Sequence, residues 1–111
     1  MIEDVSTSQT LKILEENQNN KNFFIIDCRT PREFAFGHFE KAVNIDFYSP
    51  SFFQELDKLD KNKRYLIYCR TGSRSKAALG IMERLGFKEV YNMKYGILDL
   101  NPSEKEKFLK N

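Results

Sequence analysis

Short, continuous hydrophobic runs dominate the pattern of the chain. Residues 23–26 read Phe-Phe-Ile-Ile and residues 65–68 read Tyr-Leu-Ile-Tyr, and each run ends at a polar residue or a cysteine. Runs of this length without alternation are typical of strands that are buried on both faces, as in a parallel sheet. Residues 42–45 and 89–91 are shorter candidate strands.

Capping signals predict helices between these strands. Ser6 and Gln9 have the spacing of a capping box, so a first helix is expected to start near Ser6. Each of the three prolines follows a capping residue, at positions 30–31, 49–50 and 101–102. Because proline is favoured at the first helical position, these pairs predict three further helix starts. The lysine-rich tail, residues 105–110, is expected to be the solvated face of a last helix.

The clearest helix is predicted over residues 73–85, with Gly86 as its stop. Its apolar stripe is expected to comprise Ala77, Ala78, Ile81, Met82 and Leu85. Strands that alternate with helices indicate an α/β domain with a mainly parallel sheet. In such sheets, functional sites form beyond the carboxyl ends of the strands.

Length and composition indicate one globular domain over residues 1–111. The net charge of +2, from 18 basic and 16 acidic residues, demands neither a nucleic-acid nor a membrane partner. No run approaches the roughly 18 apolar residues of a transmembrane helix. The acidic N-terminus does not resemble a signal peptide, so a cytoplasmic location is expected. The two cysteines are then expected to be free thiols.

Cys69 lies where the topology predicts a site, after a buried strand and before the clearest helix. The segment that follows it holds the candidate substrate-binding residues Arg70, Thr71, Gly72, Ser73, Arg74 and Ser75. A loop that runs into a helix start presents unpaired N–H groups, and the helix dipole adds positive charge. These groups and the two arginines favour a thiolate, so we expect the pKa of Cys69 to be lowered and Cys69 to be the catalytic nucleophile. The same concavity suits a small anion.

The sequence resembles the rhodanese family over about residues 23–98. Residues 27–34 (DCRTPREF) look like the family's Asp-x-Arg-x-Pro-x-Glu-Phe/Tyr segment, and residues 37–45 (GHFEKAVNI) look like its Gly-His-Ile segment. Residues 68–75 (YCRTGSRS) resemble its active-site loop, and residues 86–93 (GFKEVYNM) resemble its Gly-Phe-x-x-Val-Tyr-Asn strand. The four segments occur in the family's order.

This resemblance implies a three-layer fold, with a central, mainly parallel five-stranded sheet and helices on both faces. It also implies a sulfurtransferase similar to thiosulfate sulfurtransferase. Cys69 would take a sulfane sulfur from a small anionic donor, such as thiosulfate, polysulfide or a persulfide, and pass it to a thiol or cyanide. A persulfide-carrying protein is a further candidate partner. No cofactor or metal is implied.

Two alternatives stay open at this stage. Related phosphatases have a longer active-site loop, whereas only four residues separate Cys69 from Arg74 here, which suits a single sulfur better than a phosphate. Some rhodanese-like domains lack the cysteine and act as binding or regulatory modules, and the retained Cys69 argues against that role. The family's Gly-Gly and tryptophan are absent near Tyr95-Gly96, which affects the expected shape of the substrate site.

Five residues near the expected site are given structural roles. Asp27, Arg29 and Glu33 are interpreted as a charge and capping cluster, since a buried Asp27 needs a partner such as Arg29. His38, the only histidine, is also expected to be structural. Cys28 is interpreted as a packed strand residue. The alternative hypothesis is that Cys28 resolves an oxidised or persulfidated Cys69, which requires Cα atoms within about 7 Å of each other.

Overall fold

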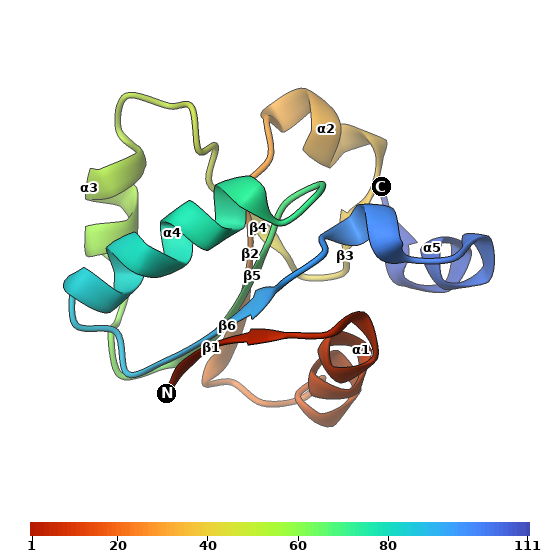
Figure 1. Cartoon of the computed structure of the whole chain (residues 1–111), viewed down its shortest axis with the longest axis horizontal. Coiled ribbons are helices and arrows are strands. Elements are labelled where there is room, and N and C mark those ends of the chain that lie inside the picture. The colour runs from red at the N-terminus through yellow and green to blue at the C-terminus, as the bar shows by residue number, and fades with distance from the viewer.

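The central sheet has five strands, all paired in parallel, in the order β1-β6-β5-β2-β4 (Figure 1). This computed structural model describes all residues 1–111. The strands are β1 (Ile2–Val5), β2 (Phe23–Asp27), β4 (Val43–Asn44), β5 (Arg64–Tyr68) and β6 (Glu89–Met93). The sheet confirms the predicted α/β class, and the two long hydrophobic runs are its neighbouring inner strands β2 and β5.

Helices cover both faces of the sheet (Figure 1). On one face lie α3 (Phe52–Asp57) and α4 (Ser73–Arg84), and on the other lie α1 (Thr7–Glu16) and α5 (Pro102–Phe108). The remaining helices are α2 (Pro31–Phe36), which follows β2, and the 3-10 turn η1 (Ile97–Asp99). A small antiparallel pair, β3 (His38–Phe39) with β7 (Leu109–Lys110), ties the C-terminal residues to the segment after α2.

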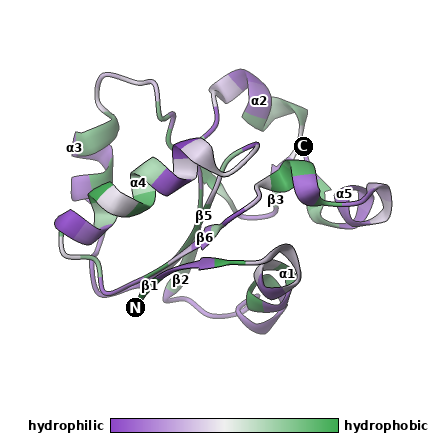
Figure 2. Cartoon of the chain, in the orientation of Figure 1, coloured by the Kyte–Doolittle hydropathy of each residue, from purple (hydrophilic) through white to green (hydrophobic).

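The core is divided by the sheet into two hydrophobic clusters. On the side of α3 and α4, Ile26 and Ile67 pack with Leu56 and Met82. On the side of α1, the strands contribute a second set of buried side chains that includes Leu66. Green, hydrophobic segments alternate with purple, hydrophilic ones along α3 and α4 (Figure 2). Strands β2 and β5 therefore contribute side chains to both clusters, which explains why their hydrophobic runs do not alternate.

Three of the predicted helix starts are confirmed by their caps. Ser6, Thr30 and Asn101 each accept a hydrogen bond from the third helical residue in a complete capping box. The prediction at residues 49–50 is wrong, because α3 begins at Phe52. There the Ser49 hydroxyl accepts the Ser51 N–H at 3.2 Å in a turn, and the helix starts at the first buried aromatic residue.

Other boundaries also differ from the sequence predictions. Of the predicted stripe of α4, Ala78 and Met82 are buried, and Ile81 and Leu85 pack against the same cluster, but Ala77 is exposed. Ser75 and Leu79 are buried as well. The helical tail ends at Phe108, and Lys110 belongs to β7. Strand β1 was not predicted, because its four residues contain no continuous hydrophobic run. None of the helices has the length and apolar character needed to cross a membrane.

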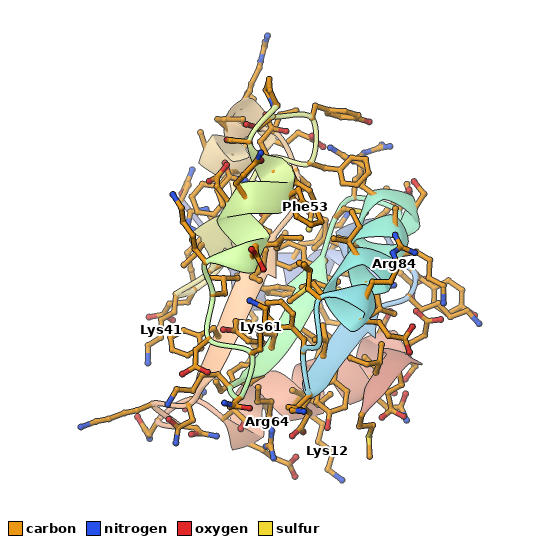
Figure 3. The ribbon with its side chains drawn as sticks, turned by 90° about the vertical axis from the view of Figure 1, so that its left-hand side faces the viewer. Lys12, Lys41, Phe53, Lys61, Arg64 and Arg84 are labelled. Carbon is orange, nitrogen blue, oxygen red and sulfur yellow. The ribbon has the colours of Figure 1, made fainter.

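The carboxyl ends of β2 and β5 lie side by side, with Asp27 paired to Tyr68. Arg64 begins β5 and marks the opposite end of the sheet, where Lys12 also lies (Figure 3). A hollow of about 340 Å³ is lined by these two side chains. That hollow is therefore at the far end of β5 from Cys69.

Candidate active site

The Cys69 sulfur is the centre of the loop between β5 and α4. The backbone N–H of Gly72 points at Cys69 Sγ with an N–S distance of 3.1 Å. The backbone N–H and the hydroxyl of Ser75 each approach the same sulfur at 3.5 Å. The loop thus wraps around the sulfur and directs three hydrogen-bond donors toward it, one from Gly72 and two from Ser75.

These donors decide the protonation state of Cys69. Burial alone would raise the pKa of the thiol, since it disfavours the charged form. The Ser75 hydroxyl and the backbone N–H groups of Ser75, Gly72 and Thr71 act in the opposite direction and outweigh burial, so the pKa of Cys69 is lowered. Since the thiolate is the reactive form, the loop prepares Cys69 as a nucleophile. The Cys69 side chain is buried, so the loop must yield locally before a donor reaches the sulfur.

Two glycines let the backbone pass close to this loop. Gly72 has a φ of +98°, and a Cβ there would lie 1.9 Å from the carbonyl oxygen of Lys94. Gly96 has a φ of +68°, and its Cβ would lie 2.2 Å from the carbonyl oxygen of Arg70. Only glycine accepts this combination of positive φ and close backbone contact.

The segment after β6 supports the loop from the other side. The Ile97 N–H donates to the Cys69 carbonyl at 3.1 Å, and the Leu98 N–H donates to the Arg70 carbonyl at 2.9 Å. Leu100 is buried in the core, whereas Tyr95 and Leu98 are exposed. The stretch that departs from the family pattern therefore forms the rim of the Cys69 loop.

Arg74 is held by a carboxylate from a different helix. Its Nη1 and Nη2 atoms lie 2.8 and 3.0 Å from the two carboxylate oxygens of Glu33. Its guanidinium also lies over the Tyr48 ring, 5.6 Å from the centroid. The bond from Arg74 lowers the pKa of Glu33 to about 2, and the same pair raises the pKa of Arg74. Most of the charge of Arg74 is thus compensated within the protein.

Arg70, Thr71 and Ser73 have exposed side chains around the loop. Arg70 forms no salt bridge, so its charge is available to a ligand at the rim. Of the six predicted loop residues, Gly72 and Ser75 are buried beside the sulfur, and Arg74 is half-buried.

Asp27 and Arg29 form a buried ion pair under the neighbouring strand end. Arg29 Nη2 lies 2.7 Å from Asp27 Oδ2, and both side chains are almost fully buried. The same guanidinium donates to the Gly37 carbonyl at 2.6 Å. This pair fixes the segment after β2, on which α2 and Glu33 depend.

His38 takes part in local packing. Its ring stacks on Phe34 with a centroid distance of 3.6 Å, and Nδ1 donates to the Phe34 carbonyl at 2.8 Å. Cys28 is fully buried in the same hydrophobic cluster as Cys69, and both are free thiols. No group of three or more His, Cys, Asp or Glu side chains is arranged to hold a metal ion.

Sequence reasoning missed two features of this site. The first is the ion pair between Glu33 and Arg74, which are 41 residues apart in sequence and lie at the starts of two different helices. Only the capping role of Glu33 was visible in the sequence. Tyr48, which lies against Arg74, was not singled out because it is in a turn without a recognisable motif.

The fold and the loop together define a parallel α/β domain with a cysteine at a strand-to-helix turn. The rhodanese-like domain family matches residues 10–101, and the chain belongs to this family. Among solved structures, a rhodanese-related protein from Thermoplasma volcanium is 26% identical with a TM-score of 0.70, covering 86% of this chain and 87% of its own. A rhodanese-like domain protein from Staphylococcus aureus is also 26% identical, with a TM-score of 0.69 and the same coverage.

The curated relatives are longer proteins. The tRNA uridine(34) hydroxylase of Pelagibacter ubique is 37% identical over 90 residues, which cover 80% of this chain and 30% of the relative. The tRNA uridine(34) hydroxylase of Hamiltonella defensa is 32% identical over 111 residues, covering 93% of this chain and 31% of the relative. The chain thus spans about a third of the length of the curated relatives it matches.

Proposed function

We propose that this protein transfers a sulfane sulfur through a persulfide on Cys69. The observation that supports this function best is the ring of donors around Cys69 Sγ, with the Gly72 N–H at 3.1 Å and the Ser75 N–H and hydroxyl at 3.5 Å. Such donors stabilise an anionic sulfur, and they act on the thiolate before reaction and again when it is the leaving group.

The reaction consists of two displacements at sulfur. The Cys69 thiolate attacks the sulfane sulfur of the donor, a new S–S bond forms, and the donor's own bond to that sulfur breaks. With thiosulfate the leaving group is sulfite. A thiol or cyanide then attacks the terminal sulfur, and Cys69 leaves as the thiolate. Such a cycle gives ping-pong kinetics.

Arg70 supports an anionic donor, because it is exposed at the loop and forms no salt bridge. The donors to be considered are thiosulfate, polysulfide and a small or protein-bound persulfide. The spacing of four residues between Cys69 and Arg74 bears on the phosphatase alternative, because this short loop suits a single sulfur better than a phosphate. We therefore favour sulfur transfer over dephosphorylation.

The test is a turnover assay with cyanide as acceptor and each donor in turn, read out as thiocyanate. The expected result is double-reciprocal plots with parallel lines for at least one donor and no activity in Cys69→Ser. An aryl phosphate is the parallel substrate for the phosphatase alternative. Hydrolysis of the aryl phosphate without thiocyanate production from any donor would reverse our assignment.

A second candidate follows from the named relatives. The identity of 37% over 80% of this chain favours a role for the domain in hydroxylation of uridine 34 in tRNA. Under this candidate tRNA would be the substrate, although the net charge of +2 does not by itself demand a nucleic-acid partner. It is tested by incubating the protein with unmodified tRNA in the presence of dioxygen, the oxidant that the added hydroxyl requires, and measuring hydroxylated uridine after digestion, with Cys69→Ser as control. A cytoplasmic location, where both candidates would meet their substrates, stays a prediction.

A further inference from the structure

A second thiol lies next to Cys69 at the end of the neighbouring strand. Strands β2 and β5 pair as far as Asp27 and Tyr68. Cys28 is the residue directly after β2, and Cys69 is the residue directly after β5. The Cys28 N–H donates to the Tyr68 carbonyl at 2.9 Å. This bond belongs to the last pair of the parallel ladder, Asp27 with Tyr68, so the ladder ends directly before the two cysteines. Cys28 and Cys69 therefore leave neighbouring strands from paired residues.

Both cysteine side chains lie on the same face of the sheet. Ile26 and Ile67, two positions earlier, enter the cluster on the side of α4, and Cys28 and Cys69 belong to that same cluster. Neighbouring strands are about 4.8 Å apart, and disulfides form between Cα atoms about 4.4–6.8 Å apart. A bond between these sulfurs thus requires side-chain rotation and adjustment of the loop, without separation of the strands.

The two thiols differ in their readiness to react. Burial raises the pKa of Cys28, and the nearby charges of Cys69 and Asp27 raise it further. Cys69 is held as the more acidic thiol by its loop. An oxidant that enters the site therefore reacts with Cys69 first and leaves Cys28 as the reduced neighbour.

We propose that Cys28 is a resolving thiol, which forms an intramolecular disulfide with Cys69 after a hydroperoxide has oxidised Cys69. In the first step the Cys69 thiolate attacks the peroxide, an S–O bond forms, the O–O bond breaks, and hydroxide leaves from hydrogen peroxide or an alkoxide from an organic hydroperoxide. Cys69 is oxidised to the sulfenic acid and the peroxide is reduced. In the second step the Cys28 sulfur attacks Cys69 Sγ, the S–O bond breaks, and the hydroxyl leaves with the Cys28 proton as water.

The disulfide has a clear consequence for the site. It draws Cys69 Sγ away from the N–H groups of Gly72 and Ser75, so no sulfur transfer occurs until an external thiol reduces the bond. It also protects Cys69 from further oxidation to the sulfinic and sulfonic acids, which ordinary thiols do not reverse. Cys28 has a fixed position for this attack, because its carbonyl also accepts the Phe47 N–H at 3.2 Å.

The test treats reduced protein with a small excess of hydrogen peroxide and follows intact mass. Wild type is expected to lose about 2 Da, and dithiothreitol is expected to restore the original mass. Trypsin digestion without reduction is expected to yield peptide 22–29 joined to peptide 65–70, each of which contains one of the two cysteines. In Cys28→Ala and Cys28→Val, we expect a gain of about 32 Da on Cys69 that dithiothreitol does not remove. The unfolding temperature of each variant shows whether it is folded.

The inference is overturned if wild type gains oxygen at the same rate as folded Cys28→Ala, or if peroxide produces no joined peptides. The joined peptides are measured on wild type, so the result stands even where neither variant folds. Failure of the proposed function is a separate outcome, because a protein without sulfurtransferase activity still forms this cross-link.

Discussion

Replacement of Gly72 by alanine tests the structural basis of the Cys69 loop. The new Cβ would lie 1.9 Å from the Lys94 carbonyl oxygen and 2.9 Å from its carbon, and both are backbone atoms. Positive φ costs a residue with a Cβ about 1–2 kcal/mol, and a forced backbone shift adds about 1–3 kcal/mol. We therefore expect Gly72→Ala to lower the free energy of unfolding by about 2–5 kcal/mol. At about 4 °C for each kcal/mol, the unfolding temperature falls by about 8–20 °C.

The matched control is Gly80→Ala in the middle of α4. Gly80 has no positive φ, and its nearest heavy atom would be a flexible guanidinium nitrogen of Arg84 at 4.0 Å. Alanine is favoured over glycine in a helix, so this variant is expected to gain about 0.5–1 kcal/mol. Urea unfolding of both variants measures the difference. A Gly72→Ala protein within about 0.5 kcal/mol of wild type would refute the packing derived for the loop.

Two further changes test the groups around the sulfur. Ser75→Ala removes the hydroxyl donor and leaves the backbone N–H, so we expect the pKa of Cys69 to rise. The pH dependence of thiol alkylation measures this pKa. An unchanged profile would show that the Ser75 hydroxyl does not stabilise the thiolate. Glu33→Gln breaks the ion pair with Arg74 and is expected to lower stability at neutral pH by about 1–2 kcal/mol, allowing for partial exposure of Glu33. Because its folded pKa is depressed from 4.5 to about 2, this stabilisation is complete above 4.5 and is lost as the pH falls toward 2. A stability gap between wild type and Glu33→Gln that stays constant over that range would contradict the pairing.

The sequence predicted the parts of the fold that depend on local patterns. Each of these patterns occupies only a few consecutive residues. Examples are the buried runs in β2 and β5 and the capping boxes at Ser6 and Thr30. Strand β1 could not be predicted in this way, because its short segment becomes a strand only through pairing with β6.

The candidate site shows the same division. Cys69 and its donor loop follow from a strand, a glycine and a helix start that are adjacent in sequence. The approach of Gly96 to Arg70 and the bond between Glu33 and Arg74 depend on tertiary packing between distant segments. Sequence alone therefore pointed to Cys69 as the candidate nucleophile but did not show that Arg74 is paired with Glu33.

The most direct test of the account is the intact mass of reduced protein after incubation with excess thiosulfate, and then with polysulfide if needed. Uptake of one sulfur is expected, a gain of about 32 Da that cyanide removes and that Cys69→Ser does not show. Because a sulfinic acid has nearly the same gain in mass, removal by cyanide distinguishes the persulfide from oxidation. Protein that takes up no cyanide-labile sulfur from any of these donors would contradict the central claim that Cys69 is a sulfur carrier.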